Sequence, residues 1–139
     1  MREVSVGVLF NRDTVLACRR KDSARYGRKW EFPGGKIEPG ESAREALDRE
    51  LHEELAIRVV EASLFHRQEW VYPASATDRE DGVFRVHYFT VSEFEGEPQN
   101  LAFSEIRWVT VEELQALDTL EGNGEVIALL AGKLFSGRG

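Results

Sequence analysis

The sequence has few cysteines and prolines and lacks a long hydrophobic run. It contains one cysteine, Cys18, and four prolines in 139 residues, so an intrachain disulfide and a disulfide-stapled secreted scaffold are both excluded. No apolar run of about 18 residues is present, which excludes a membrane-spanning helix. The first residues also lack the apolar stretch of a signal peptide. These absences predict a soluble, cytoplasmic protein with no membrane partner.

Positive charge is also in short supply. The sequence has 18 basic and 25 acidic residues, which give a net charge of −7. A surface of that sign repels the phosphate backbone of DNA or RNA, so a nucleic-acid polymer is not the expected partner. Six of the basic residues fall within residues 19–29, directly before an acidic region. Such a juxtaposition suits a small polyanion that carries its own metal ion.

Strand-like and helix-like patterns alternate along the chain. Segments that alternate in polarity or are rich in β-branched and aromatic residues are expected to be strands, and they lie at 4–10, 15–18, 58–71, 83–91 and 106–109. Turn chemistry at Asp81-Gly82 and an interruption at Tyr72-Pro73 separate two of them. The chain length predicts a single domain over residues 1–139.

Two capping boxes mark the starts of helices. Ser42 with Glu45 predicts a helix beginning at Ala43, and Thr110 with Glu113 predicts another that runs to about residue 117. Residues 125–135 are expected to form a last helix, after a break at Asn123-Gly124. A chain that mixes strands and helices in this way predicts an α/β (α+β) fold, in which helices pack on the faces of a sheet.

Three glutamates share one patch of the helix that begins at Ala43. Glu50, Glu53 and Glu54 are spaced i, i+3 and i+4, so their side chains are neighbours. Magnesium ions bind oxygen ligands, often a few carboxylates with waters and phosphates. A solvated acidic face is the alternative. However, Glu50 and Glu54 fall at the edge of the helix's apolar stripe, where clustered negative charge requires a counter-cation. This stripe consists of Ala43, Ala46, Leu47, Leu51 and Leu55. The counter-cation is either a metal ion or the neighbouring Arg49.

The spacing around these glutamates resembles the signature of the Nudix hydrolases. The pattern is a glycine, five residues, a glutamate, seven residues, Arg-Glu-Leu, one residue, Glu-Glu, one residue and a final pair that is Ala-Ile in this chain. Its defined positions are Gly35, Glu41, Arg49, Glu50, Leu51, Glu53, Glu54, Ala56 and Ile57. Ala56 is the one departure, because the family usually has glycine there, at a helix exit that favours a positive φ.

The resemblance implies a Nudix fold, a mixed β-sheet sandwiched between α-helices, and a pyrophosphohydrolase that depends on Mg²⁺ or Mn²⁺. In the family, the carboxylates that match Glu50, Glu53 and Glu54 bind the metal, together with the backbone carbonyl that matches Gly35. The arginine that matches Arg49 orients the glutamates, and the position of Glu41 ties the preceding loop to the helix. Family members cleave a nucleoside diphosphate linked to another group, and the metal activates the attacking water.

Outside the signature, the chain is similar to the MutT branch, whose members hydrolyse 8-oxo-dGTP and so sanitise the nucleotide pool. Residues 30–38 (WEFPGGKIE) match the segment before the signature. In that branch, Arg20 matches an arginine that contacts substrate, Phe32 an aromatic residue near the base, and Asn123 an asparagine at the purine edge. Each has another interpretation: Phe32 as a core residue, Arg20 as a surface ion pair, and Asn123 as a turn residue before Gly124.

The general base has no obvious match. Many relatives carry a further glutamate shortly before the tryptophan of the late strand, and that place falls near Ala102 here. Glu105 is the closest substitute and Glu97 the next.

The leading hypothesis is hydrolysis of a nucleoside triphosphate, with 8-oxo-dGTP favoured, to the monophosphate and pyrophosphate. The alternatives are a related enzyme for CTP, another dNTP or ADP-ribose, and a non-catalytic nucleotide-binding module. The sequence is compatible with a monomer and with a homodimer.

Overall fold

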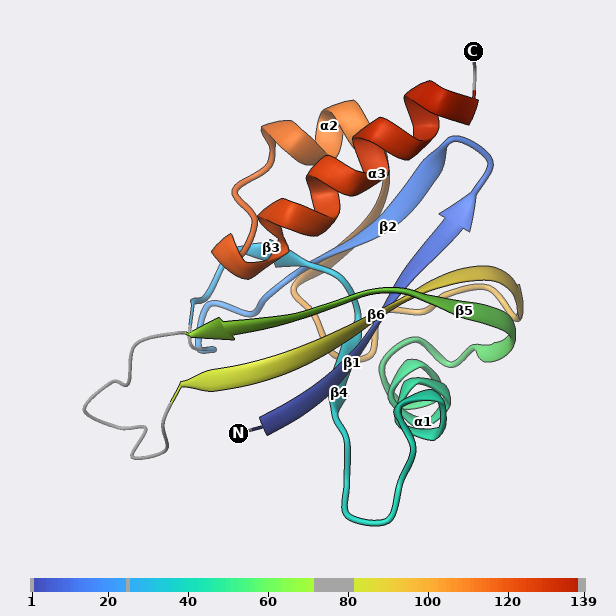
Figure 1. The fold of residues 1–139 in the computed structure, drawn as a ribbon, viewed down its shortest axis with the longest axis vertical. Coiled ribbons are helices and arrows are strands. Elements are labelled where there is room, and N and C mark those ends of the chain that lie inside the picture. The colour runs from blue at the N-terminus through green and yellow to red at the C-terminus, as the bar shows by residue number, and fades with distance from the viewer. Residues whose placement is uncertain (1, 25, 72–81, 138–139) are drawn as a thin grey trace.

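The computed structural model describes residues 2–24, 26–71 and 82–137 (Figure 1). In that part of the chain, the strands are β1 (Arg2–Asn11), β2 (Thr14–Arg19), β3 (Trp30–Glu31), β4 (Gly34–Lys36), β5 (Arg58–Val71), β6 (Val83–Glu95) and β7 (Glu105–Thr110). The helices are α1 (Ala43–Leu55), α2 (Val111–Ala116) and α3 (Gly124–Gly137), and a 3₁₀ turn, η1, spans Glu121–Asn123.

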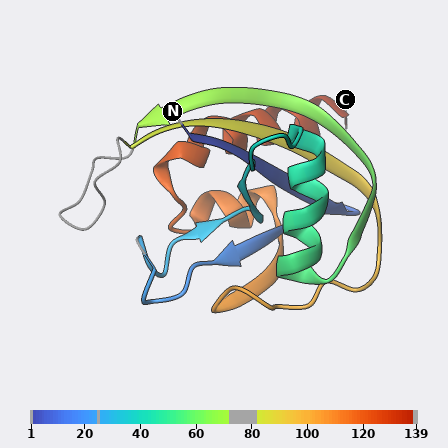
Figure 2. The same cartoon turned by 90° about the horizontal axis from the view of Figure 1, so that it is seen from below.

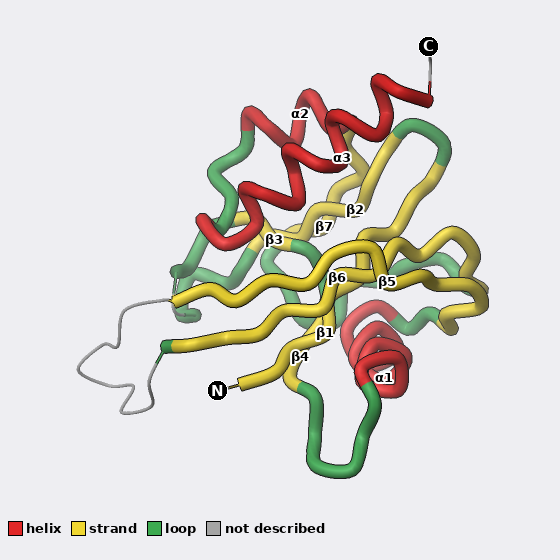
Figure 3. The backbone as a smooth tube through the Cα atoms, viewed as in Figure 1, coloured by secondary structure: helices red, strands yellow, loops and turns green. Residues whose placement is uncertain are grey.

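The strands form one mixed, seven-stranded sheet. Its main path is β3-β2-β1-β6-β5, while β4 pairs with β1 and β7 pairs with β2. Strands β1 and β6 are parallel, and they place Val4 opposite Val86 and Val6 opposite Tyr88. Figures 1, 2 and 3 show α1 on one side of the sheet and α2 and α3 on the other. The expected mixed sheet between helices is confirmed.

The alternation of β2 explains how one strand serves both layers. Val15 and Ala17 belong to the core cluster beneath α2 and α3, whereas Leu16 and Cys18 belong to the cluster beneath α1. Successive side chains of a strand point to opposite faces, so a fully apolar strand in the middle of the sandwich buries all of them. Cys18 is a buried free thiol, as its apolar surroundings in the sequence suggest. Burial raises the pKa of this thiol well above its usual value.

Helix α1 begins and ends as its sequence predicts. The Ser42 side chain accepts a hydrogen bond from the Glu45 backbone N–H, and the Glu45 carboxylate accepts one from the Ser42 N–H. Of the apolar stripe, Ala46, Leu47, Leu51 and Leu55 are buried, while Ala43 is partly buried against the same core. The exit residue, Ala56, has φ 57° and ψ 35°, and its N–H donates to His52 O over 3.0 Å. Alanine therefore adopts the left-handed conformation expected of glycine, at a cost of about 1 kcal/mol.

Most expected elements are present with shifted ends. The strand expected at 83–91 continues to Glu95, because it pairs along its length with β5. Asn123-Gly124, expected as a break, is the point where η1 passes directly into α3. The short strands β3 and β4 have no periodic signal and were not expected. Tyr72-Pro73 and Asp81 of the expected turn lie outside the described residues. Among the described residues, no helix has the length and hydropathy needed to cross a membrane.

Candidate active site

Two consecutive glycines bring β4 against the glutamate face of α1. The Gly34 N–H donates to Glu54 Oε1 over 2.9 Å. A Cβ on Gly35 would lie 2.3 Å from Glu50 Cδ, and one on Gly34 would lie 2.1 Å from the carbonyl oxygen of Ser5. Side chains at these positions would overlap their neighbours, so only glycine permits this approach. The backbone of β4 therefore touches two of the three glutamates directly.

Glu54 is the most perturbed of these carboxyl groups. Its pKa is raised from 4.5 to about 8, chiefly by burial and also by the negative charges of Glu50, Glu31 and Glu53, while the hydrogen bond from the Gly34 N–H opposes the shift. A carboxyl group in this position is protonated at neutral pH unless a cation approaches it. The site is therefore deficient in positive charge next to Glu54.

Arg49 supplies positive charge on the other side of the cluster. Its guanidinium donates to both oxygens of Glu41 over 2.8 and 3.0 Å, to Glu50 Oε1 over 2.9 Å and to the Lys36 carbonyl over 3.0 Å. Glu53 Oε2 lies 3.5 Å from the same group. The hydrogen bonds from Arg49 and from the Glu38 backbone lower the pKa of Glu41 to about 2. Arg49 thus binds the loop before α1 to the helix and fixes the Glu50 carboxylate.

The three glutamates do not have equal exposure. The Glu50 side chain is 16% exposed and the Glu53 side chain 57% exposed. In the described ranges, no three histidine, cysteine or acidic side chains are already grouped as a cation site. Arg49 draws Glu50 and Glu53 toward itself, whereas the Gly34 N–H draws Glu54 toward β4. The expected convergence is therefore partial: the carboxylates share one face, but they bind different partners.

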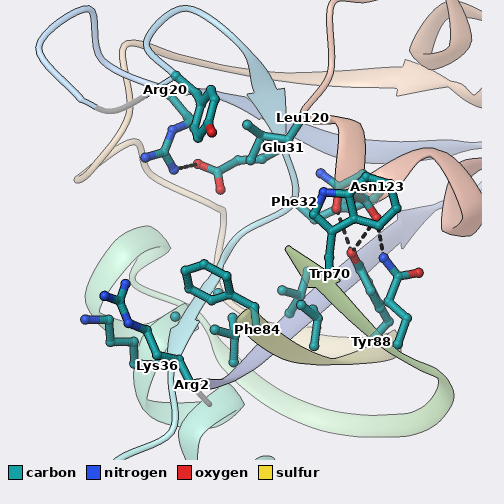
Figure 4. Close-up of a pocket in the computed structure, with 18 residues that line it drawn as sticks. Arg2, Arg20, Glu31, Phe32, Lys36, Trp70, Phe84, Tyr88, Leu120 and Asn123 are labelled. Carbon is teal, nitrogen blue, oxygen red and sulfur yellow. Dashed lines mark hydrogen bonds and ion pairs between the residues drawn. The ribbon is translucent and has the colours of Figure 1, made fainter. Parts of the chain in front are cut away.

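A pocket of about 350 Å³ opens on the other side of β4. It brings together Arg20, Phe32 and Asn123, which come from distant parts of the sequence, and it includes Gly34 and Gly35 in its wall (Figure 4). Its other lining residues are Arg2, Val4, Val6, Tyr26, Glu31, Lys36, Gln68, Trp70, Phe84, Val86, Tyr88, Leu120 and Gly122. Apolar and aromatic walls with a few polar groups are typical of small-molecule sites.

The three sequence-selected residues have different environments in the pocket. Phe32 is 3% exposed and belongs to the core as well as to the pocket wall. Arg20 Nη1 donates to Glu31 Oε2 over 2.8 Å, and burial raises the pKa of that carboxyl despite the nearby guanidinium. Asn123 is 8% exposed, and its Oδ1 accepts a hydrogen bond from the Tyr88 hydroxyl over 2.8 Å. It is therefore more than a solvated turn residue.

Several pocket residues escaped the sequence reasoning. Phe84, Val86 and Tyr88 line the pocket because alternate residues of β6 share a face. Alternation groups these three residues, but this strand is apolar on both faces, so its sequence does not indicate which face lines a pocket. The parallel pairing that sets Val4 and Val6 beside it has no local signal.

The candidates for the missing base are placed differently from the glutamates of α1. Glu105 Oε2 accepts from Arg107 Nη2 over 2.7 Å, and Glu105 is paired across the sheet with Arg19. It is absent from the lining of the described pocket. Ala102 packs against the core beneath α1. The backbone N–H of the preceding residue, Leu101, donates to the Glu54 carbonyl oxygen over 3.1 Å. The loop thus passes close to the glutamate helix but brings no carboxylate at position 102.

Comparison with known proteins gives consistent matches over nearly the whole chain. Residues 1–130 match the model of the NUDIX domain. The chain is 34% identical over 129 residues to an 8-oxo-dGTP diphosphatase of Escherichia coli K12, covering 92% of this chain and 95% of that protein. It is 32% identical over 114 residues to a CTP pyrophosphohydrolase of the same organism, covering 81% and 78%.

Solved structures have the same architecture. A MutT structure from a study of Aliivibrio salmonicida and Vibrio cholerae superposes with a TM-score of 0.78 at 28% identity, covering 95% of this chain and 98% of that one. A MutT protein of Methanosarcina mazei Go1 gives a TM-score of 0.79 at 20% identity, with 95% and 94% coverage, which is a likeness of fold.

Proposed function

The chain belongs to the NUDIX family and is a hydrolase of that family, and on this premise we propose that it cleaves a nucleoside triphosphate to the monophosphate and pyrophosphate. The observation that carries the proposal is the position of Gly34 and Gly35. Both line the pocket, and on the opposite side they contact Glu54 and Glu50. Only the backbone of these two glycines separates the pocket from the glutamates, so the phosphates of a nucleotide whose base lies in the pocket would extend toward the glutamates.

The residues around Gly35 fit a divalent cation. Glu50, Glu53, Glu54 and the Gly35 carbonyl would hold Mg²⁺ or Mn²⁺, which favours oxygen ligands. The raised pKa of Glu54 supports this assignment, because it reflects a half-buried carboxyl group without a positive neighbour. When bound, the cation would screen phosphate charge and lower the pKa of a water molecule.

The protein's own groups would position the reaction. Arg49 fixes Glu50 and ties the loop at Glu41 to α1. Glu53 is the most exposed of the three glutamates, so its carboxylate is accessible to a water molecule. We therefore place the general base at Glu53 rather than at Glu105, whose charge is already paired with Arg107 and which lies outside the pocket lining of the described residues.

For the substrate, we propose an oxidised guanine nucleotide, 8-oxo-dGTP. The 8-oxo-dGTP diphosphatase of Escherichia coli is similar over nearly the full length of both chains. The grouping of Phe32, Arg20 and Asn123 in one pocket supports a base that stacks on an aromatic wall and meets an amide. The similarity to a CTP pyrophosphohydrolase makes CTP the second candidate.

The test is a comparison of kcat/KM for 8-oxo-dGTP, dGTP, CTP and ADP-ribose with Mg²⁺, in which hydrolysis is measured by release of pyrophosphate from the triphosphates and of AMP from ADP-ribose. We expect 8-oxo-dGTP to be preferred over dGTP. Glu53→Gln and Glu54→Gln should each lower kcat by at least about 100-fold, as expected when a base or metal ligand is lost. Asp48→Asn is the matched control, because Asp48 lies on α1 but pairs with Arg44.

Three outcomes would contradict parts of the proposal. Preference for CTP would move the substrate assignment to the pyrimidine nucleotide. Full activity in both glutamine variants would remove the metal assignment. Absence of turnover with every nucleotide, under Mg²⁺ and under Mn²⁺, would leave only a binding function.

A further inference from the structure

The amide of Asn123 is held by a buried tyrosine on the neighbouring strand. Tyr88 is 2% exposed, and its hydroxyl donates to Asn123 Oδ1 over 2.8 Å. Both residues line the pocket (Figure 4). Asn123 Nδ2 has no protein acceptor among the described residues. The two ends of this amide are therefore unequal: the oxygen is engaged by the protein, and the NH₂ group is left to donate.

The direction of the Tyr88 hydrogen bond follows from its distances to two neighbouring acceptors, one of which also binds Gln68. A hydroxyl has one proton to donate, and in the described part of the chain Asn123 Oδ1 lies 2.8 Å and the Gly122 carbonyl oxygen 3.4 Å from the Tyr88 hydroxyl. The Gly122 carbonyl already accepts a close hydrogen bond from Gln68 Nε2. A carbonyl oxygen has two lone pairs, so the Gln68 bond alone does not exclude Tyr88, but the shorter distance to Asn123 Oδ1, 2.8 Å against 3.4 Å, directs the Tyr88 proton to Asn123.

The orientation of Gln68 is fixed in turn from β5. His66 Nε2 lies 3.0 Å from Gln68 Oε1, and with the proton on Nε2 the histidine donates to that oxygen. The NH₂ group of Gln68 then has to point to Gly122. The His66 ring also packs 5.9 Å from the Tyr88 ring, centroid to centroid. The polar wall of the pocket, formed by Asn123, Tyr88, Gly122, Gln68 and His66, is thus one connected hydrogen-bond network. This network disfavours the flipped orientation of the Asn123 amide.

We propose that Tyr88, supported by Gln68, is a positioning residue that fixes Asn123 as a hydrogen-bond donor and so selects bases with a carbonyl oxygen at that edge. The inference rests on the proposed function and makes its substrate class more specific. Guanine offers O6 as an acceptor, whereas adenine and cytosine present amino groups at the corresponding position. An amino group facing the NH₂ of Asn123 would leave two donors without an acceptor, which is unfavourable in a buried pocket. The wall therefore favours 6-oxopurine nucleotides over CTP.

The test compares dGTP with 2-aminopurine deoxyribonucleoside triphosphate, in which hydrogen replaces O6 and N1 carries no proton, so the contribution of O6 is the part of the preference that depends on Asn123. In the unmodified protein, we expect kcat/KM for dGTP to exceed that for the analogue by about tenfold, the value of one hydrogen bond between neutral groups. Tyr88→Phe should reduce this ratio to about twofold, chiefly through the KM for dGTP, because the amide is then free to rotate. Gln68→Leu should change the ratio in the same direction, because the Gly122 carbonyl then competes for the Tyr88 proton.

The controls separate positioning from a general effect on folding. Thr90→Val removes a hydroxyl from the same strand, where Thr90 donates to Ser63 O over 3.4 Å, and it should leave the ratio unchanged. Asn123→Ala should lower the ratio at least as far as Tyr88→Phe does, and adding Tyr88→Phe to Asn123→Ala should have no further effect on it. A Tyr88→Phe variant that lowers kcat/KM equally for both nucleotides, or that keeps the tenfold ratio, would overturn the proposal.

Binding of the monophosphates separates this inference from the proposed function. If no nucleotide is hydrolysed, calorimetry with dGMP and 2-aminopurine deoxyribonucleoside monophosphate still reports the preference. A preference for dGMP that disappears in Tyr88→Phe would then support the positioning role while the catalytic proposal fails. Turnover of dGTP with a dGTP-to-analogue ratio that does not change in Tyr88→Phe would support the catalytic proposal and refute the positioning role.

Discussion

Removing the Glu54 carboxyl group should change how the stability of the metal-free protein depends on pH. The pKa of Glu54 is raised from 4.5 to about 8 in the folded state, so the folded protein binds this proton more tightly than the unfolded chain. Its stabilising effect is therefore fully present below about pH 4.5 and is lost as the pH rises to about 8. At 1.36 kcal/mol for each pKa unit, the loss is at most about 5 kcal/mol. We expect about 2–3 kcal/mol, since a half-buried side chain keeps some contact with water.

The measurement is urea unfolding in the presence of EDTA at several pH values between 5 and 9. In Glu54→Gln, the glutamine oxygen still accepts from the Gly34 N–H, but no proton is exchanged in this range. The variant should therefore be similar in stability to the unmodified protein near pH 5 and more stable near pH 9. The control Asp48→Asn should show the same pH dependence of the free energy of unfolding as the unmodified protein. At pH 9, saturating Mg²⁺ should raise the free energy of unfolding of the unmodified protein, because a bound ion stabilises only the folded state. The increase should be much smaller in Glu54→Gln.

Parallel stability curves for Glu54→Gln and the unmodified protein would refute this reasoning. They would mean that the Glu54 carboxyl group is ionised near pH 5 in the folded state, with its charge satisfied by the protein alone. The structural case for a cation at this position would then disappear.

Three further predictions follow from single contacts. Ala56→Gly should raise the free energy of unfolding by about 0.5–1 kcal/mol in urea titrations, because it relieves a left-handed alanine at φ 57°; an unchanged or lower value would mean that the exit of α1 is not strained. Gly35→Ala should lower kcat by about 100-fold with little change in Tm, since its Cβ would meet the Glu50 carboxylate at 2.3 Å and displace it; the idea fails if kcat is retained. Glu105→Gln should keep kcat within about twofold, whereas a loss of about 100-fold would return the role of general base to Glu105.

The parts of the fold that the sequence predicts well are those with local signals. Helix α1 is specified by its capping box, by its buried leucines at spacings of three and four, and by its exit at Ala56, all within a short segment. Strand alternation groups Val4, Val6 and Val8 on one face of β1, but its prediction of a single buried face is wrong, because residues 5–9 are buried on both faces. Strand β6 buries residues on both faces, as its composition predicts. Pairing between distant strands has no comparable signal. The parallel contact of β1 with β6, which builds one wall of the pocket, depends on how the whole chain closes.

The sequence predicts some parts of the candidate site better than others. Resemblance to a family selected Arg20, Phe32 and Asn123, and the fold places all three around one pocket, although no property of the three residues alone requires it. Spacing along a helix predicted that three glutamates share a face. It did not predict that Arg49 and the Gly34 N–H would hold them apart, because those partners come from side-chain geometry and from a strand outside the helix.

The glycine pair of β4 has a consequence for how this protein tolerates change. Gly34 and Gly35 separate two groups of residues: the aromatic and polar side chains of β5, β6 and η1 on one side, and the carboxylates of α1 on the other. Substitutions that reshape the first group leave the second in place, provided the backbone between them does not move. Libraries that vary Trp70, Phe84 and Tyr88 while keeping the two glycines should therefore yield proteins with altered nucleotide preference and an intact hydrolytic half.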